Sequence, residues 1–243
     1  TNPVPAGWSI GLATAPHPLG PWKKYEHNPV LAGFGYVGGV VKVNGKYHLY
    51  AEHPIGSTAP DYGPISLATA DKPTGPWTRW EKNPVLQAGE KGAWDAGGFS
   101  EGEVLHFGGM FHLFAGGATV HPERIRTQES IGYASSADGY QFVKHPANPV
   151  APREAIPNAA ALSEVHALIE PPFIYLYHTL RYKEPRRPED RAKFPNIEDL
   201  GIQVLATERP FQLTMPVLRR ETLGPQAATA LADSPPLCLG SVA

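Results

Sequence analysis

One tripeptide, Asn-Pro-Val, recurs along this chain and constrains its fold more than any other feature. Complete copies begin at Asn2, Asn28, Asn83 and Asn148, and a degenerate copy is Met215-Pro216-Val217. The prolines at 29, 84, 149 and 216 lie about 55 to 67 residues apart. That period, filled with short strand-like runs and Gly/Pro turns, is typical of a repeat protein in which each unit is one four-stranded propeller blade.

The expected strands align between the units. Second strands are predicted at 47–51, 111–115 and 174–177, which are aromatic or β-branched runs after a turn. Third strands are predicted at 10–15, 65–70, 131–136 and 202–207. Fourth strands are expected after turns that carry Trp22, Trp77 and Tyr140, and these aromatic residues are predicted to pack between blades.

The predicted fold is therefore an all-β propeller that forms a single domain over residues 1–243, because no shift in composition marks a linker. The first unit has room for its third and fourth strands only, and residues 235–239 mimic residues 171–175, so the first and last blades are both expected to be incomplete. Five blades are favoured, since ring closure removes exposed strand edges, and four blades are the alternative.

Composition narrows the function classes. A formal net charge of −2, from 21 basic and 23 acidic residues, gives no polycationic footprint for nucleic acid, and no apolar run is long enough to cross a bilayer. Neutral small molecules are the expected partners. Cys238 is the only cysteine, which excludes an intrachain disulfide and a thiolate metal cluster. The compartment and the oligomeric state stay open.

Two glutamates are the leading catalytic candidates. Ser100-Glu101 and Ser163-Glu164 fall at the same point of successive units, the start of the first strand, which lines the central channel of a propeller. The long connections at 54–64, 118–130, 181–200, 86–98 and 150–160 are expected to wall a pocket around them, and plain solvated surface is the alternative. Paired carboxylates are what glycosidic cleavage needs.

The segment that precedes Glu101 adds further candidates. Trp94 is predicted either to stack on a sugar face or to pack between blades. Asp95 is predicted to bind sugar hydroxyls or to adjust an acid, with a turn role as the alternative. Ser100 is included as a substrate contact because it adjoins Glu101.

Several basic side chains lie at expected strand ends near the same pocket. His53, His166, His178 and Arg181 are candidate substrate contacts, although such histidines are more often core residues. Neither a helical His-x-x-x-His pair nor a cysteine partner supports zinc. No cofactor is expected, and calcium bound in the central channel is the alternative. Signatures of phosphate loops and serine hydrolases are absent.

The blade pattern Ala-Thr-Ala-x4-Gly-Pro-Trp…Asn-Pro-Val-Leu, the run at 100–105 ahead of 110–114, and the run at 94–100 resemble the five-bladed propeller glycoside hydrolases. That superfamily includes arabinanases, β-xylosidases, arabinofuranosidases, invertases and levanases. The resemblance implies that Glu101 is the general acid, with Glu164 as its competitor. It also implies that Asp95 binds substrate. The family's base or nucleophile lies on a first-blade strand that this sequence lacks, so the base stays unassigned.

The expected function is hydrolysis of a furanoside or pentoside, with inversion implied by the resemblance. A non-catalytic carbohydrate-binding propeller is the second hypothesis, because the site lacks an assigned base. A glycoside phosphorylase of related fold is the third, and it would need basic residues beside the acid to hold phosphate.

Overall fold

The computed structural model describes residues 9–52, 63–119, 128–170, 173–183, 198–209 and 212–214. For Glu101 and for residues 198–200, 203–209 and 212–214 only the backbone is described. Apart from one short 3₁₀ helix, η1 (Arg153–Ala155), every element in these ranges is a strand. The all-β prediction is therefore confirmed for the described residues.

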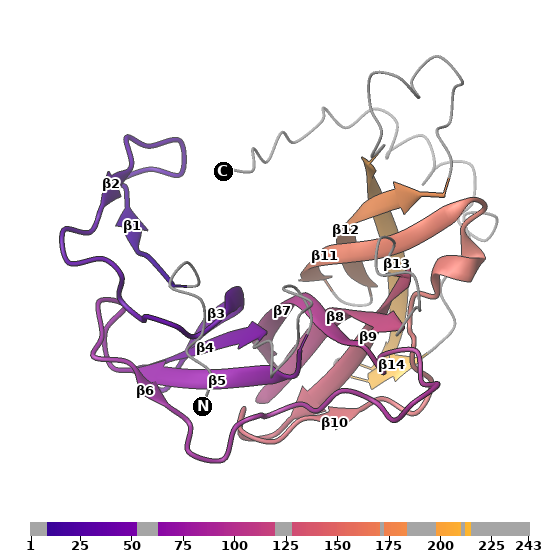
Figure 1. The fold of residues 1–243 in the computed structure, drawn as a ribbon, viewed down its shortest axis with the longest axis horizontal. Coiled ribbons are helices and arrows are strands. Elements are labelled where there is room, and N and C mark those ends of the chain that lie inside the picture. The colour runs from indigo at the N-terminus through magenta and orange to yellow at the C-terminus, as the bar shows by residue number, and fades with distance from the viewer. Residues whose placement is uncertain are drawn as a thin grey trace.

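The strands form successive antiparallel sheets that follow one another around an arc (Figure 1). The first is the pair β1 (Ala13–Thr14) and β2 (Lys23–Lys24). The second has four strands in chain order: β3 (Tyr36–Val43), β4 (Lys46–Glu52), β5 (Ile65–Ala70) and β6 (Thr78–Arg79). This is the meander of one propeller blade.

Two further four-stranded units continue the pattern. One consists of β7 (Gly98–Phe107), β8 (Met110–Thr119), β9 (Gln128–Ser136) and β10 (Val143–Lys144). The other consists of β11 (Ala159–Glu170), β12 (Phe173–Tyr182), β13 (Glu198–Arg209) and β14 (Gln212–Thr214). A parallel pairing of Ala161 with Glu129 joins β11 to β9, so these two blades form one continuous eight-stranded sheet.

The predicted strand order within units is confirmed, and the ends differ by a few residues. Three complete blades and one two-stranded unit lie within the described ranges. The expected final hairpin at 235–239 and the copies of the tripeptide at 2–4 and 215–217 lie outside them. The number of blades in the ring and the incompleteness of the first and last ones stay predictions.

The asparagine of the repeated tripeptide has a definite structural task. In the second unit, Asn83 Oδ1 accepts a hydrogen bond from Leu67 N at 2.8 Å, and its Nδ2 donates to Leu67 O at 2.9 Å. Asn28 binds both backbone groups of Leu12 in the same way, and Asn148 binds those of Tyr133. The asparagine thus acts as one residue of an additional strand beside the third strand of its blade.

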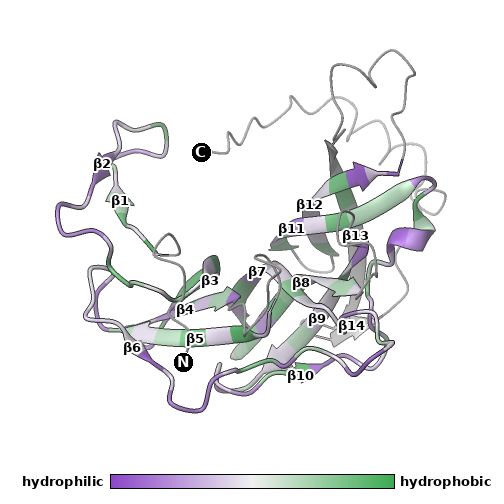
Figure 2. Ribbon diagram, in the orientation of Figure 1, coloured by the Kyte–Doolittle hydropathy of each residue, from purple (hydrophilic) through white to green (hydrophobic). Residues whose placement is uncertain are grey.

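The core lies between neighbouring blades. One cluster of buried residues includes Tyr50, Leu67, Phe99 and Leu113, from the second and third units, and a second includes Phe114, Ile131, Leu162 and Leu176, from the third and fourth. Hydrophobic residues concentrate in the central strands, while β2 and the connections are hydrophilic (Figure 2). Burial between sheets is the main stabilising term of such a fold.

Two of the three aromatic residues in the turns before the fourth strands pack between blades as predicted. Trp77 packs on the cluster that joins the first two units, and Tyr140 packs on the core of the next interface. The prediction for Trp22 is wrong, because its side chain is 62% exposed.

Candidate active site

The first strand of each complete blade carries a β-bulge near its start. Pairing shifts by one residue between Val37 and Gly39 in β3, between Phe99 and Gly102 in β7, and between Ser163 and His166 in β11. A bulge bends the strand and redirects its side chains, and bulges are common beside active sites. Glu101 and Glu164, which the repeat alignment made equivalent, lie in equivalent bulges.

Glu164 has an unusual backbone and a well-held side chain. Its φ angle of 54° is in the left-handed region, which disfavours a residue with a Cβ by about 1–2 kcal/mol. Thr179 Oγ1 donates a hydrogen bond to Glu164 Oε2, and Arg181 Nη2 lies 3.2 Å from Oε1. The side chain keeps 44% of its surface exposed. Strained residues that remain open to solvent are candidates for function.

The neighbouring blade presents Glu101 from β7, where only its backbone is described. Ser100 beside it is buried, and its hydroxyl lies 3.5 Å from Gly116 O, to which it donates a hydrogen bond. Gly116 leaves the space that this arrangement needs, because a Cβ there would lie 2.4 Å from Ser100 Oγ and 2.9 Å from Glu129 Oε2. Ser100 therefore adjoins a second carboxylate from the same blade.

Two buried glutamates at this end of the blades escaped the sequence analysis. Glu129, at the start of β9, is fully buried, and Glu52, at the end of β4, is 2% exposed. Glu52 pairs with Tyr36 at the beginning of β3, so it lies at the bulged end of its blade. In the sequence, the sign of such a residue is an acidic side chain directly next to a hydrophobic strand segment, as Glu52 is next to Ala51.

Arg181 lies between the carboxylates of two blades. Its Nη1 is 3.9 Å from Glu129 Oε1 and its Nη2 is 3.2 Å from Glu164 Oε1, while 35% of the side chain is exposed. These distances place Arg181 beside both carboxylates, and its contact with substrate stays a prediction. Because both carboxylates already engage the guanidinium, its capacity for a substrate anion is reduced.

His166 follows two residues after Glu164 and lies across the interface from β7. Its Nδ1 is 2.9 Å from Glu103 Oε2, and the side chain is 71% exposed. The hydrogen bond with Glu103 raises the pKa of His166 above its ordinary value of 6.5, and the negative charges of Glu103 and Glu164 add to that effect against a smaller cost of burial. The imidazolium form is thereby favoured close to Glu164.

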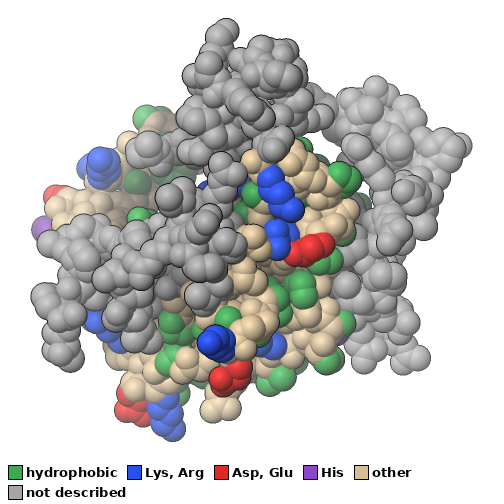
Figure 3. Space-filling view, turned by 45° about the vertical axis from the view of Figure 1, so that its right-hand side comes forward, with side chains coloured by type: hydrophobic (Ala, Val, Ile, Leu, Met, Phe, Trp, Pro, Cys, Tyr) green, Lys and Arg blue, Asp and Glu red, His purple; other side chains and the backbone are tan. Residues whose placement is uncertain are grey.

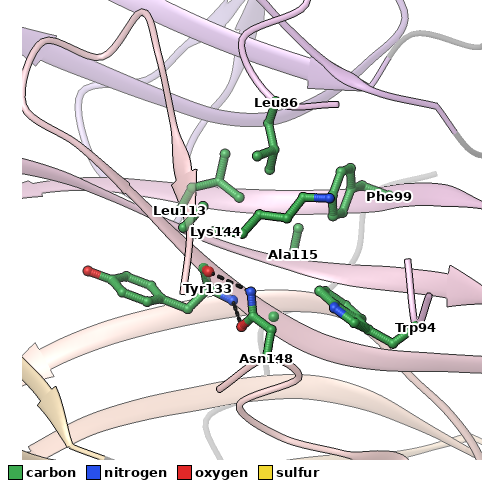
Figure 4. A pocket seen from close by; sticks show the side chains of 10 residues that line it. Leu86, Trp94, Phe99, Leu113, Ala115, Tyr133, Lys144 and Asn148 are labelled. Carbon is green, nitrogen blue, oxygen red and sulfur yellow. Dashed lines mark hydrogen bonds between the residues drawn. The ribbon is translucent and has the colours of Figure 1, made fainter. Parts of the chain in front are cut away.

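Trp94 and Asp95 lie in the packed interior of the third unit. The indole of Trp94 rests on the backbone of Gly117 and Gly132, where a Cβ would be 1.9 Å and 2.1 Å from ring atoms. It borders a cavity of about 10 Å³, the size of a single water, whose lining includes Lys144 (Figure 4). Trp94 therefore fills a space between strands, which favours its packing interpretation.

Asp95 is 2% exposed, and its Oδ2 lies 2.5 Å from Lys144 Nζ on the outer strand β10. The ion pair ties the connection before β7 to the far edge of the blade. It offsets the cost of burying the carboxylate, and this favours a structural role over contact with substrate. The predicted catalytic help from Asp95 stays a prediction.

His178 and His53 complete the predicted set. His178 is 1% exposed and packs against Gly201 of β13, and burial lowers its pKa below 6.5. This environment is that of a core histidine. His53 lies outside the described residues. Within the described part of the chain, no group of three or more His, Cys, Asp or Glu side chains could hold a metal ion, and no helix could span a membrane.

The surface around the strands carries mixed charge. On the face shown in Figure 3, basic and acidic side chains lie near one another among apolar groups. This distribution agrees with the near-neutral formal charge of −2.

Comparisons with known proteins place the fold. A scan of protein-family models and a search of curated proteins find no match. Among solved structures, one titled simply "Glycoside hydrolase" aligns with a TM-score of 0.58 at 15% identity, over 86% of this chain and 65% of that one. Zg3597, a family 117 glycoside hydrolase of Zobellia galactanivorans, aligns with a TM-score of 0.50 at 21% identity, over 80% and 51%.

An endo-arabinase from Bacteroides thetaiotaomicron aligns with a TM-score of 0.52 at 10% identity, covering 76% of this chain and 55% of the enzyme. The chain thus spans between half and two thirds of the length of these three structures. Identities this low carry information on the fold alone. The resemblance predicted from the blade pattern is confirmed at that level, and the chain has the fold of the β-propeller glycoside hydrolases.

Proposed function

We propose that this chain carries the active site of a glycoside hydrolase, with its catalytic carboxylates at the bulged ends of β7 and β11. The observation that supports this most is the environment of Glu164. It combines a left-handed backbone, partial exposure, and two hydrogen-bond donors from β12. Glu101 lies in the equivalent bulge of the neighbouring blade. Two carboxylates on adjacent inner strands suit acid/base cleavage of a glycosidic bond.

The proposed substrate is a furanoside or pentoside of arabinofuranosyl or xylosyl type, cleaved with inversion. The superfamily resemblance supports this choice, and the endo-arabinase among the similar structures agrees with it. The engagement of Arg181 with Glu129 and Glu164 weakens the phosphorylase alternative, because that reaction needs a free basic group for phosphate.

The test is release of 4-nitrophenol from a panel of aryl glycosides, led by arabinofuranoside and xyloside. Glu101→Gln and Glu164→Gln should each reduce kcat by at least a hundredfold, the lower range for loss of an acid or base. Glu170→Gln is the matched control, because this exposed glutamate ends the same strand as Glu164. Its activity should equal that of the wild type.

A carbohydrate-binding protein without catalysis would give a different result. Such a protein would turn over none of the glycosides, either as the wild type or as a glutamine variant, but would bind arabino- or xylo-oligosaccharides in calorimetry. That outcome would replace the hydrolase proposal.

A further inference from the structure

Glu129 is the most completely buried carboxylate near the candidate site. It comes from β9, and its Oε2 lies close to Gly116, since a Cβ on that glycine would be 2.9 Å away from it. Removing a carboxylate from water costs several kcal/mol unless a charge of opposite sign compensates. Arg181, which belongs to the next blade, supplies such a charge at 3.9 Å.

The geometry of Arg181 connects this buried group to Glu164. Nη1 faces Glu129 and Nη2 faces Glu164, so one guanidinium spans two carboxylates from two blades. A guanidinium is planar and rigid, and fixing one of its nitrogens restricts the direction of the other. Because Glu129 is fully buried and Glu164 is 44% exposed, Glu129 is the anchored end of this arrangement.

Glu164 therefore receives hydrogen bonds at both of its oxygens. Thr179 donates to Oε2 and Arg181 donates to Oε1. One oxygen of Glu164 thus faces a guanidinium and the other faces a hydroxyl donor, which together fix the orientation of the carboxyl group. A group that attacks the anomeric carbon or activates water has to be held in one orientation beside the bond that is cleaved.

We propose that Glu129 is a positioning residue that anchors Arg181 and thereby holds Glu164 as the base or nucleophile of the reaction. The catalytic part of this inference rests on the proposed function and leaves the acid role to Glu101. The positioning part concerns the protein alone and can be measured without turnover.

The first experiment observes Arg181 directly in the substrate-free protein. Its Nε–H signal in two-dimensional NMR is assigned from its loss in Arg181→Lys. We expect a slowly exchanging signal in the wild type and a fast-exchanging one in Glu129→Gln. The control is Glu154→Gln, since Glu154 is 63% exposed and pairs with Arg153 instead. An equally protected Arg181 signal in Glu129→Gln would overturn the anchoring role.

The second experiment measures kinetics with the best aryl glycoside. Glu129→Gln and Arg181→Lys should each lower kcat by up to about a hundredfold, with KM nearly unchanged, because misplacing a catalytic group by about 1 Å has effects of that size. Glu154→Gln should match the wild type in both kcat and KM.

The outcomes separate the two proposals. Wild-type values of kcat and KM in both variants would refute the catalytic part of the inference in an active enzyme. An inactive wild type in which Glu129→Gln still releases Arg181 would reject the hydrolase function while retaining the anchoring. If Glu129→Gln does not fold, Arg181→Lys still decides the kinetic part, because Arg181 is 35% exposed and its replacement leaves the core intact.

Discussion

The asparagine of the Asn-Pro-Val repeat shows at the scale of a single residue why a motif recurs in a propeller. Each copy pairs its side-chain amide with both backbone groups of one third-strand residue, as Asn83 does with Leu67. The interaction depends on the length and the two-sided chemistry of the asparagine side chain. No other residue could supply both bonds as well from that position.

Asn83→Ala should therefore lower the free energy of unfolding by about 1–3 kcal/mol, because Leu67 N loses its partner and Leu67 O keeps only the hydrogen bond from Trp80 N. Asn28→Ala is the comparison, since the equivalent bonds of Asn28 are exposed and water can replace them. Urea denaturation of both variants measures the difference. Equal losses at the two positions would contradict the role of burial.

The buried histidines predict how stability depends on pH. Burial lowers the pKa of His48, His112 and His178 below their ordinary value of 6.5. Below pH 6.5 the unfolded chain binds protons that the folded chain does not, so stability falls as the solution becomes more acidic. His166 has a raised pKa and acts in the opposite direction, but its exposure reduces its contribution.

We expect the free energy of unfolding to decrease from pH 7.5 to pH 5.5. His178→Gln should reduce the slope of that decrease, whatever its effect on stability at pH 7.5. His27→Gln, at a position that is 73% exposed, is the control. Denaturation curves at intervals of half a pH unit give the slopes, and an identical slope for His178→Gln would show that this side chain does not contribute.

Glu101, Glu164 and Glu129 show which residues of the candidate site could be predicted from the sequence and which could not. The alignment of first strands put Glu101 and Glu164 at matching positions, and the structure shows that each lies within a β-bulge, which the sequence did not predict. It could not find Glu129, because the residue lies on a third strand and is linked to Glu164 through Arg181 of another blade. Contacts across blades depend on three-dimensional packing, which has no signal in the local pattern.

Among the elements, β8 and β9 show how strands accommodate a large side chain. Gly117 of β8 and Gly132 of β9 are diagonal neighbours on adjacent strands, and both lie under the indole of Trp94, where neither presents a side chain. In the sequence, Trp94 suggested a platform for sugar rings as readily as a packing role. The absence of Cβ atoms on two adjacent strands is what distinguishes the two interpretations.

Gly132→Ala should destabilise the protein by about 1–3 kcal/mol, because the new methyl group would overlap the indole. In a Trp94→Ala background the same substitution should cost much less, since the indole is no longer there to be displaced. A double-mutant cycle by urea denaturation measures this coupling. A cost that is the same in both backgrounds would exclude the indole as its cause.

For the whole molecule, contacts between blades determine how the repeats hold together. Tyr50 of β4 donates a hydrogen bond to Gly139 O of the next unit at 2.9 Å, and Arg79 of β6 binds the carbonyls of Ala32 and Gly33 in the connection before its own blade. The first strands approach even more closely, since a Cβ on Gly38 would lie 2.4 Å from Gly102 O. The two backbones are therefore in direct contact.

Gly38→Ala should separate β3 from β7 and cost about 1–3 kcal/mol through overpacking. Because the contact joins two blades, we also expect the unfolding transition to become broader. Gly45→Ala offers a comparison at a turn with open space around the Cβ position, although its φ of 82° carries a separate backbone cost. Transitions of equal width in Gly38→Ala and the wild type would argue against coupling through this contact.

The general architecture was predictable because the repeat imposes the same strand order on every unit. The blade meander and the all-β class follow from that periodicity, whereas the superfamily resemblance rests on the residues of the individual motifs. The prediction that Trp22 packs between blades was wrong, because the repeat pattern does not specify which residues cover the indole of the first unit. The way two blades merge through Ala161 and Glu129 was likewise invisible in the sequence.

The asparagine pairing has a further consequence for behaviour in concentrated solution. The fourth strand of the second unit, β6, is only two residues long, and the outer edge of β5 is completed by groups that are not part of a strand. Trp80 N and the side chain of Asn83 bind the backbone of Leu67, and residues 85 and 86 bind that of Ile65. Open strand edges promote sheet-to-sheet aggregation. By binding both backbone groups of Leu67, Asn83 contributes to closing this edge.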